Sequence, residues 1–274
     1  MNSILDIACM QDYIRTCEAG WQQGWHERNG GNLTYRMTRE EAALAAPFFA
    51  YDRPYVRMGV RAPHLAGEHF IATGSGKYFQ NVARCPQENL CIVQINEEGD
   101  AFRIVWGLTK GGRPTSEFES HFMNHAVRVQ ATDGACRVIY HAHPAHVIAL
   151  TYVLPLTSRD FTRALWKSAT ECPVVFPQGV GVVPWMVPGG PQIAMATSEL
   201  MKRFDAAVWA HHGLFVSGPD FDTTFGLMHT IEKAAQIHVL ALSCGQGIRQ
   251  TIGDDDLRAI ARDFGVTLNE EFLD

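Results

Sequence analysis

The sequence RVIYHAH, residues 137–143, carries two histidines in a run whose β-branched and aromatic lead-in is typical of a strand. Because successive side chains of a strand point to opposite faces, His141 and His143 would lie on the same face, one pleat apart. This spacing suits two ligands of one metal ion, and a catalytic zinc commonly takes three protein ligands and keeps one position open. An isolated H-x-H is more often a pair of strand histidines bonded to their neighbours, so the metal site is a hypothesis that needs a third ligand.

A candidate for the third ligand follows a second predicted strand. Residues 206–210 are apolar and lead directly into His211, His212 and Gly213. The glycine would let the backbone turn close to a metal. The sequence pattern leaves open which of the two histidines is the ligand.

Composition limits the classes of function. The chain has 274 residues, 46% hydrophobic and 19% charged, which is typical of a folded globular protein near the upper size for one core. Its net charge of −6 lacks the basic footprint of a nucleic-acid-binding protein, but anionic small molecules remain possible because backbone amides can bind them. The seven scattered cysteines contain no C-x-x-C pair and favour reduced thiols in the cytoplasm. We find no signal-peptide pattern, and the longest apolar stretch is too short to cross a membrane.

Two segments of small residues could bind an anion. Residues 29–32 (NGGN) contain Asn-Gly, the commonest hairpin turn signal, and their alternative role is a nest of backbone amides. Residues 74–77 (GSGK) follow a strand predicted over 69–73, where amides and a hydroxyl can approach a phosphate. The spacing matches neither a P-loop nor a dinucleotide fingerprint, so each segment alone is a weak signal.

A helix is predicted to begin within residues 113–119. Ser116 and Glu119 have the spacing of a capping box. Glu117 can be a first-turn acid favoured by the helix dipole. Its alternative role is a general base beside an anion site formed by the free N–H groups and hydroxyls of Thr115 and Ser116.

Three further titratable residues have simple structural explanations. His121 and His125 lie four apart on the predicted helix but lack the Glu of H-E-x-x-H, so we expect packing or solvent-facing positions. Glu171 precedes a short strand predicted over 174–176, and an isolated acid there is normally on the surface.

The remaining periodicity mixes helices and strands along the chain. Helices are predicted over residues 4–21, 144–153, 160–168, 192–204, 220–243 and 254–264, and further strands over 33–37, 90–96, 101–106 and 179–185. Residues 38–68 have little periodicity and are predicted to be irregular.

Five motifs together resemble one known family. They are residues 29–32 (NGGN), 73–76 (TGSG), 114–117 (PTSE), 141–143 (HAH) and 211–213 (HHG). In this order and at these separations they resemble the class II aldolase and adducin family, over nearly the whole chain. The resemblance implies an α/β fold, a single-domain αβα sandwich over residues 1–274 around a mixed, largely antiparallel sheet. It also implies a homotetramer with active sites at subunit interfaces.

The resemblance assigns a role to each candidate residue. One zinc ion per subunit would be bound by His141, His143 and His212. The substrate phosphate would be bound by Asn29, Gly31, Asn32, Ser75, Gly76, Thr115 and Ser116. Glu117 would transfer the proton at C3 of a sugar-phosphate substrate. Glu171 of the neighbouring subunit would transfer the proton of the substrate hydroxyl that becomes the aldehyde of the second product.

The implied activity is that of a zinc-dependent lyase. Longer phrases, such as residues 104–109 (IVWGLT) and 184–189 (PWMVPG), are closest to family members that cleave L-rhamnulose 1-phosphate to dihydroxyacetone phosphate and L-lactaldehyde. Another ketose-phosphate aldolase, a 4-epimerase or a dehydratase on the same scaffold is the alternative. A non-catalytic assembly module like adducin is disfavoured because the histidines and Glu117 are retained. We expect a sugar-phosphate substrate and neither a nucleic-acid nor a membrane partner.

Overall fold

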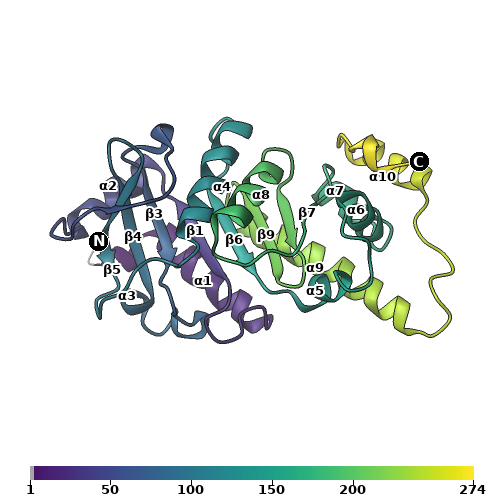
Figure 1. Cartoon of the computed structure of the whole chain (residues 1–274), viewed down its shortest axis with the longest axis horizontal. Coiled ribbons are helices and arrows are strands. Elements are labelled where there is room, and N and C mark those ends of the chain that lie inside the picture. The colour runs from purple at the N-terminus through teal and green to yellow at the C-terminus, as the bar shows by residue number, and fades with distance from the viewer. Residues whose placement is uncertain (1–2) are drawn as a thin grey trace.

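One sheet of nine strands runs through the part of the molecule that the computed structural model describes, residues 3–274 (Figure 1). The strands are β1 (Asn32–Arg36), β2 (Val56–Arg57), β3 (His69–Thr73), β4 (Leu90–Ile95), β5 (Ala101–Gly107), β6 (Val138–Ala142), β7 (Gly181–Val183), β8 (Ala206–Trp209) and β9 (Gly213–Gly218). Their order is β2-β5-β4-β3-β1-β6-β9-β8-β7. Neighbours are antiparallel except β7 and β8, which are parallel. The predicted mixed, largely antiparallel sheet is confirmed.

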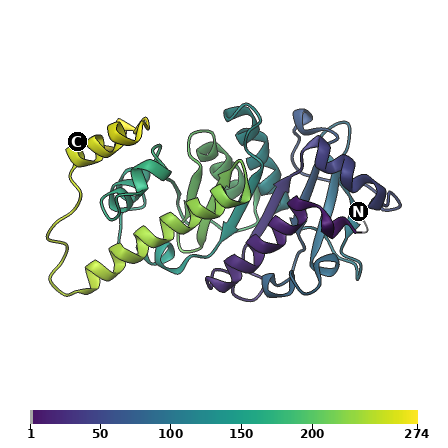
Figure 2. The ribbon, with the colours of Figure 1, turned by 180° about the vertical axis from the view of Figure 1, so that it is seen from behind.

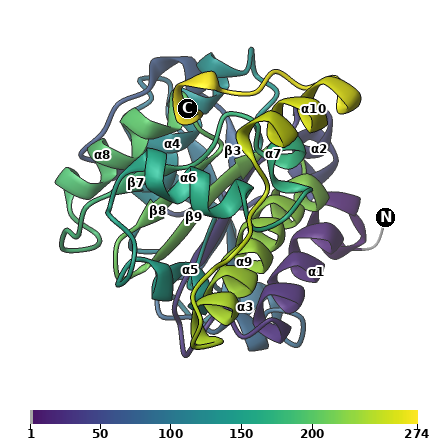
Figure 3. The same ribbon diagram turned by 90° about the vertical axis from the view of Figure 1, so that its right-hand side faces the viewer.

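Helices cover both faces of this sheet. They are α1 (Ala8–Gln22), α2 (Arg39–Ala45), α3 (Pro86–Asn89), α4 (Phe118–Ala131), α5 (Ala145–Leu150), α6 (Ser158–Trp166), α7 (Cys172–Val175), α8 (Pro191–Met201), α9 (Phe221–Ser243) and α10 (Asp254–Phe264). Seen from behind, α1 and α9 run across one face (Figure 2). The edge-on view places α4 and α8 on the other face (Figure 3). Helices α6, α7 and α10 lie beyond β7 (Figure 1), and no helix of residues 3–274 is long and apolar enough to span a membrane.

Alternation along β6 decides which layer receives the histidines. Val138, Tyr140 and Ala142 pack into the core with residues of α1 and α9. Ile139 packs into a separate core with residues of α8. Because side chains alternate along a strand, His141 points to the same side as Ile139, toward the layer of α4 and α8.

Several predicted elements differ from the structure. Residues 38–68 contain α2, whose capping box of Thr38 and Glu41 satisfies the first free N–H groups of a helix too short to show clear periodicity. A strand was predicted over 174–176, but residues 174 and 175 belong to the short helix α7 and Phe176 follows its end. A short apolar run is ambiguous between a strand and a buried helix. Strand β9 was not predicted, because it begins and ends with glycines, Gly213 and Gly218, and glycine is uncommon in strands.

One predicted helix cap is also wrong. Helix α4 begins after Glu117, which makes no side-chain cap, so Ser116 and Glu119 form no capping box. Glu119 instead accepts a hydrogen bond from the amide of Gly59 at 3.0 Å. Helix α6 is capped by Thr157, whose hydroxyl accepts from the backbone N–H of Asp160. The predicted ends of α9 and α10 are confirmed.

Candidate metal centre

The candidate site lies at one end of the three central strands β1, β6 and β9. His141 is in β6, opposite Asn32 of β1 on one side and Phe215 of β9 on the other. His143 follows the end of β6, and its backbone N–H donates to Trp25 O at 3.0 Å. Because β6 is antiparallel to both neighbours, its end meets the starts of β1 and β9, and segments distant in sequence converge there.

Three histidines form a cluster at this point. His141, His143 and His212 each offer one nitrogen, and these atoms lie within 4.8 Å of one another. His141 Nε2 and His212 Nε2 are 3.3 Å apart, and the buried Nε2 of His143 has no hydrogen-bond partner in the described residues. A set of three imidazole nitrogens fits a transition-metal ion such as zinc with an open coordination position.

Hydrogen bonds at Nδ1 orient two of these imidazoles. His141 Nδ1 lies 3.2 Å from Leu214 O, so it carries the proton and leaves Nε2 as the lone-pair nitrogen. His143 Nδ1 lies 2.7 Å from Glu27 Oε1. The ring of Phe215 stacks on His141 with 4.1 Å between centroids. Bonds of this kind fix the tautomer and direction of metal-binding histidines.

The protein environment favours the neutral form of two of the three imidazoles. Burial, together with the nearby His143 and His212, lowers the pKa of His141 well below its usual value. Burial and the nearby His143 lower the pKa of His212 to about 4. Since only the neutral imidazole is a ligand, these shifts leave His141 and His212 ready to bind a metal near neutral pH.

Two glycines give the triad its close packing. A Cβ at Gly213 would lie 2.4 Å from Ala142 O and 3.0 Å from the ring of His143. A Cβ at Gly30 would lie 2.9 Å from that same ring. Only residues without a side chain allow these loops to approach His143 so closely.

The structure separates His212 from its neighbour. His211 has a left-handed φ of 59°, and its Nδ1 lies 3.0 Å from Thr151 Oγ1. Its ring packs on Tyr152 with 4.3 Å between centroids. His212, not His211, therefore joins the other two histidines.

Glu117 lies beside the triad. Its Oε2 is 4.0 Å from His141 Nε2 and accepts a hydrogen bond from Asn32 Nδ2 at 2.9 Å. Burial raises the pKa of Glu117, and the bond from Asn32 opposes this shift. A carboxyl group whose pKa is moved toward neutral pH is suited to accept and return a proton.

Two loops of the predicted phosphate site lie side by side next to this carboxylate. The amide of Ser75 donates to Arg113 O at 2.9 Å, and the amide of Thr115 donates to Thr73 O at 2.8 Å. Thr73 Oγ1 in turn accepts from the amide of Leu33, next to Asn32, at 3.3 Å. The structure thus brings residues 73–76, 113–117 and the start of β1 together, and Asn29 is exposed in the adjoining turn.

Comparisons with known proteins give this arrangement a family. Residues 11–239 match the family described as Class II Aldolase and Adducin N-terminal domain. The chain belongs to the class II aldolase and adducin family. A rhamnulose-1-phosphate aldolase of Pectobacterium atrosepticum is 46% identical over 273 residues, which are 100% of this chain and 99% of the relative. The enzyme of that name from Klebsiella pneumoniae is 46% identical over 275 residues, 100% of this chain and 99% of the relative.

Solved structures agree with the class II aldolase fold. The sugar-phosphate aldolase of Thermotoga maritima has a TM-score of 0.74 at 24% identity, covering 87% of this chain and 96% of its own. At that identity the likeness concerns the fold alone.

One residue that supports this class II aldolase site was missed in the sequence. His26 Nδ1 donates to Gly30 O at 3.0 Å, and Tyr140 Oη donates to His26 Nε2 at 2.7 Å. Its ring stacks on Phe79 with 3.6 Å between centroids, and burial lowers the pKa of His26 to about 3. The neutral ring thus holds the turn that precedes β1. No spacing rule links His26 to Tyr140, 114 residues away.

Glu171 stands apart from the rest of the predicted site. It is exposed at the start of α7, in the group of helices beyond β7 (Figure 1). Within the described chain it makes no hydrogen bond or ion pair with the three histidines or Glu117. A single chain of this aldolase therefore does not assemble both predicted catalytic carboxylates.

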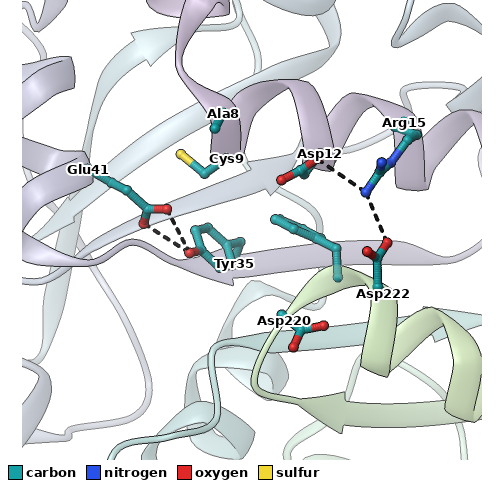
Figure 4. Close-up of a pocket in the computed structure, with 9 residues that line it drawn as sticks. Ala8, Cys9, Asp12, Arg15, Tyr35, Glu41, Asp220 and Asp222 are labelled. Carbon is teal, nitrogen blue, oxygen red and sulfur yellow. Dashed lines mark hydrogen bonds and ion pairs between the residues drawn. The ribbon is translucent and has the colours of Figure 1, made fainter.

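A separate surface pocket lies between α1 and the start of α9 (Figure 4). Its charged groups already have partners: Arg15 pairs with Asp12 at 3.2 Å and with Asp222 at 2.9 Å, and Asp220 accepts from the amide of Thr223. Tyr35 Oη donates to both carboxylate oxygens of Glu41. Such exposed ion pairs contribute little to stability, and we assign the pocket no chemistry.

Proposed function

We propose that this protein is a metal-dependent aldehyde-lyase that cleaves L-rhamnulose 1-phosphate to dihydroxyacetone phosphate and L-lactaldehyde. The observation that carries the proposal is the triad of His141, His143 and His212 with the Glu117 carboxylate 4.0 Å from His141. The full-length identity of 46% to two rhamnulose-1-phosphate aldolases supports this substrate.

The proposed cofactor is one zinc ion per subunit. Three imidazole nitrogens with an open position are the donor set of many catalytic zinc sites. The buried, unpaired Nε2 of His143 supports a ligand at this place. When bound, the metal would supply Lewis-acid stabilisation of the negative charge that develops on the substrate oxygens.

Glu117 is proposed to move the proton at C3 of the three-carbon fragment. In the cleavage direction the C3–C4 bond breaks and its electron pair stays with C3, which must then receive a proton. Burial favours the protonated carboxyl group needed for this donation. In the synthetic direction the same group accepts the proton, as microscopic reversibility requires.

Neutral donors are proposed to bind the substrate phosphate. They are Asn29, Gly31, Asn32, Ser75, Gly76, Thr115 and Ser116. The start of α4 contributes its free N–H groups and the positive end of its dipole, which favour a dianion without a cationic side chain. Fixing the phosphate holds the three-carbon unit against Glu117, and positioning of this kind lowers the entropic part of the barrier.

The proposed enzyme is a homotetramer of single-domain chains, residues 1–274, in the cytoplasm. Cleavage needs a second group that removes the C4 hydroxyl proton, because this proton and the C3 proton lie on different atoms. We assign this role to Glu171 of a neighbouring subunit. The exposed position of Glu171 supports contact with another chain.

The direct test is product analysis with purified, zinc-loaded protein. Incubation with L-rhamnulose 1-phosphate should yield dihydroxyacetone phosphate and L-lactaldehyde in equal amounts. A pentulose phosphate and L-fuculose 1-phosphate, offered separately, distinguish an epimerase and an aldolase of other specificity. Turnover of either compound with no cleavage of L-rhamnulose 1-phosphate would contradict the proposal.

The metal site predicts the behaviour of single alanine variants. His141→Ala, His143→Ala and His212→Ala should each lose most bound zinc and activity, because two imidazoles hold the ion much less tightly than three. His211→Ala is the matched control, since its ring contacts Thr151 and Tyr152 outside the triad, and it should keep the metal. Elemental analysis after dialysis measures the zinc content. A His211 variant that alone lost its metal would overturn the choice of His212.

A further inference from the structure

A line of buried hydrogen bonds runs from Glu117 into the layer between β1 and α4. Asn32 Nδ2 donates to Glu117 Oε2 at 2.9 Å, and Asn32 Oδ1 bonds to His121 Nε2. Thr34 Oγ1 lies 2.8 Å from His121 Nδ1 and 2.8 Å from His125 Nε2. Thr34, His121 and His125 are at most 1% exposed. We call these five residues the buried relay.

The chemistry of the groups gives the relay one direction when Glu117 is ionised. A carboxylate only accepts, so Asn32 presents its NH₂ group to Glu117 and its carbonyl to His121. His121 must then donate from Nε2. Burial lowers the pKa of His121 to about 3, so its ring is neutral and Nδ1 is a bare acceptor for the Thr34 hydroxyl. The oxygen of Thr34 in turn accepts from the N–H of His125 Nε2.

The far end of the relay supports the same direction. His125 Nδ1 is buried and has no hydrogen-bond partner among the described residues. In the direction given above, this atom is an unprotonated nitrogen. In the reverse direction it would be an N–H group, and unpaired buried N–H groups are rarer in proteins than unpaired acceptors. The reverse direction would also turn the carbonyl of Asn32 toward Glu117, which a carboxylate repels.

We propose that His121, held by Thr34 and His125, is a positioning residue that fixes the NH₂ group of Asn32 toward Glu117 and so holds the carboxylate facing the histidine triad. The inference rests on the proposed role of Glu117. An Asn amide has a broad, nearly two-fold torsion at its end. When Glu117 carries a proton it can donate to the carbonyl of Asn32 as well as accept from its NH₂ group, and the N–H of His121 Nε2 then keeps that carbonyl turned away from Glu117.

One residue, Phe215, packs against both the buried relay and the metal triad. The ring of Phe215 stacks on His141, with 4.1 Å between centroids, and lies 5.4 Å from the ring of His121. Phe215 therefore packs on His141 of the triad and on His121 of the buried relay. Its ring links the position of one histidine to that of the other.

Two substitutions at Thr34 separate positioning from packing. Thr34 is fully buried, and the side chains of His121 and Asn32 lie between it and Glu117 in the relay. Thr34→Val keeps the shape of the side chain but removes the hydroxyl, whereas Thr34→Ser keeps the hydroxyl and removes a methyl group. The relay predicts that Thr34→Val lowers kcat about tenfold, the rate equivalent of one hydrogen bond, with KM within about twofold of wild type. Thr34→Ser should keep most of kcat.

A purely structural role predicts the opposite order. If Thr34 only filled space, Thr34→Ser would be the more damaging variant, because it leaves a small cavity. Thermal unfolding of both variants, measured with the kinetics, shows whether each chain is folded. A Thr34→Val enzyme with wild-type kcat would overturn the proposal.

Imidazole NMR of the metal-free protein tests the relay without using activity. Long-range ¹H–¹⁵N spectra distinguish the two tautomers, and the signals of His121 are those lost in His121→Gln. Wild type and Thr34→Ser should show His121 protonated at Nε2 only, and Thr34→Val should show loss of this single form. A wild-type His121 protonated at Nδ1 would overturn the relay. A wild type that has the expected tautomer but no lyase activity would support the relay and overturn the proposed function instead.

Discussion

Glu117 occupies the first bend of α4, where its backbone caps the helix and its side chain faces His141. Glu117→Gln keeps the size of the side chain and an oxygen that can accept from Asn32, but the amide cannot carry a proton to carbon. We expect kcat to fall by about 10²–10⁴-fold, the range for loss of a general acid–base group, with zinc content and fold retained. Exchange of the C3 proton of dihydroxyacetone phosphate with solvent should fall in parallel. Near-normal exchange would show that another group serves C3.

Gly31, next to the triad, can be compared with Gly24, which has a similar backbone conformation in open space. Gly31 has a φ of +72°, and a Cβ there would lie 2.5 Å from His26 Nδ1 and 2.7 Å from His141 O. Gly24 has a φ of +77° with nothing within 4 Å of such a Cβ. Alanine at either position costs about 1–2 kcal/mol for the left-handed backbone, but only Gly31→Ala should also weaken zinc binding. Calorimetric unfolding and zinc titration of both variants measure the difference, and equal zinc affinities would contradict it.

Site residues were predicted correctly where the spacing of like residues within one strand carries the information. The spacing of His141 and His143 indicated one face of a strand, and the structure places them together. The relay was missed because His121 and His125 have the spacing of ordinary helix packing. Their partner Thr34 lies 87 residues before His121, and no local pattern shows that two such segments meet.

At the scale of elements, Asp254 connects α10 to α6 and to the chain terminus. It lies 3.0 Å from Arg163 Nη1 and 2.5 Å from Lys167 Nζ, and it accepts from the amide of Asp274 at 2.7 Å. Burial raises the pKa of Asp254, but hydrogen bonds from Lys167, Asp274 and Arg163 outweigh it, so the pKa of Asp254 lies below its ordinary value. The folded state therefore favours the ionised form.

This connection predicts a pH-dependent stability. A depressed pKa stabilises the fold above the unfolded pKa of about 4, and the contribution is lost as pH falls through the lower folded value. Asp254→Asn should lower the free energy of unfolding by about 2 kcal/mol at pH 7, because the bonds it loses involve charged groups. The difference from wild type should shrink below about pH 4.

The matched control for Asp254→Asn is its neighbour on the helix. The side chain of Asp255 is 100% exposed, and its contact with Arg258 is within the helix, so Asp255→Asn should leave the free energy of unfolding close to that of wild type. Urea unfolding at several pH values compares the two variants. A difference between Asp254→Asn and wild type that did not depend on pH would contradict the assignment to ionised Asp254.

Helices that begin with a capping side chain or end at a left-handed glycine were predicted best. Asp220 accepts from the amide of Thr223 at the start of α9, and Gly265 ends α10 with a φ of 66°. The wrong assignments are short segments. Four-residue α7 has a β-branched sequence that suits a strand, and Pro173 at its start is as compatible with a first helical turn as with a strand edge.

At the scale of the whole molecule, the proposed active site takes Glu117 from one chain and Glu171 from a neighbouring chain. If Glu171 serves the site of its neighbour, Glu117→Gln and Glu171→Gln should each be impaired as pure oligomers. Mixed oligomers formed by co-expression would contain sites with an intact Glu117 and an intact Glu171. Activity of the mixture should therefore rise well above that of either parent, measured as formation of dihydroxyacetone phosphate.

A second mixture provides the control. His143 and Glu117 belong to one chain and lie at the same site, so mixing His143→Ala with Glu117→Gln restores no complete site. That mixture should show no rise. The alternative outcome is that the mixture of Glu117 and Glu171 variants also gives only the average of its parents. That result would show that no active site combines Glu117 of one chain with Glu171 of another.

The order of the sheet could not be predicted from periodicity. Strand β1 lies between β3 and β6, and Asn32 opposite His141 pairs residues 109 positions apart. The resemblance to the class II aldolase and adducin family predicted the αβα sandwich as a whole. Five motifs in fixed order identify a family even when each motif alone is weak. Local patterns lack this information, since strand pairing depends on contacts between distant segments.

The open sheet described above has two short ends. Strand β2 is only Val56–Arg57 and strand β7 only Gly181–Val183, whereas the strands between them have four to seven residues. An edge strand offers free N–H and C=O groups that can pair with another molecule, and a short edge offers few of them. Arg57 also places a charge on one edge. The molecule therefore resists edge-to-edge aggregation, even though its sheet never closes into a barrel.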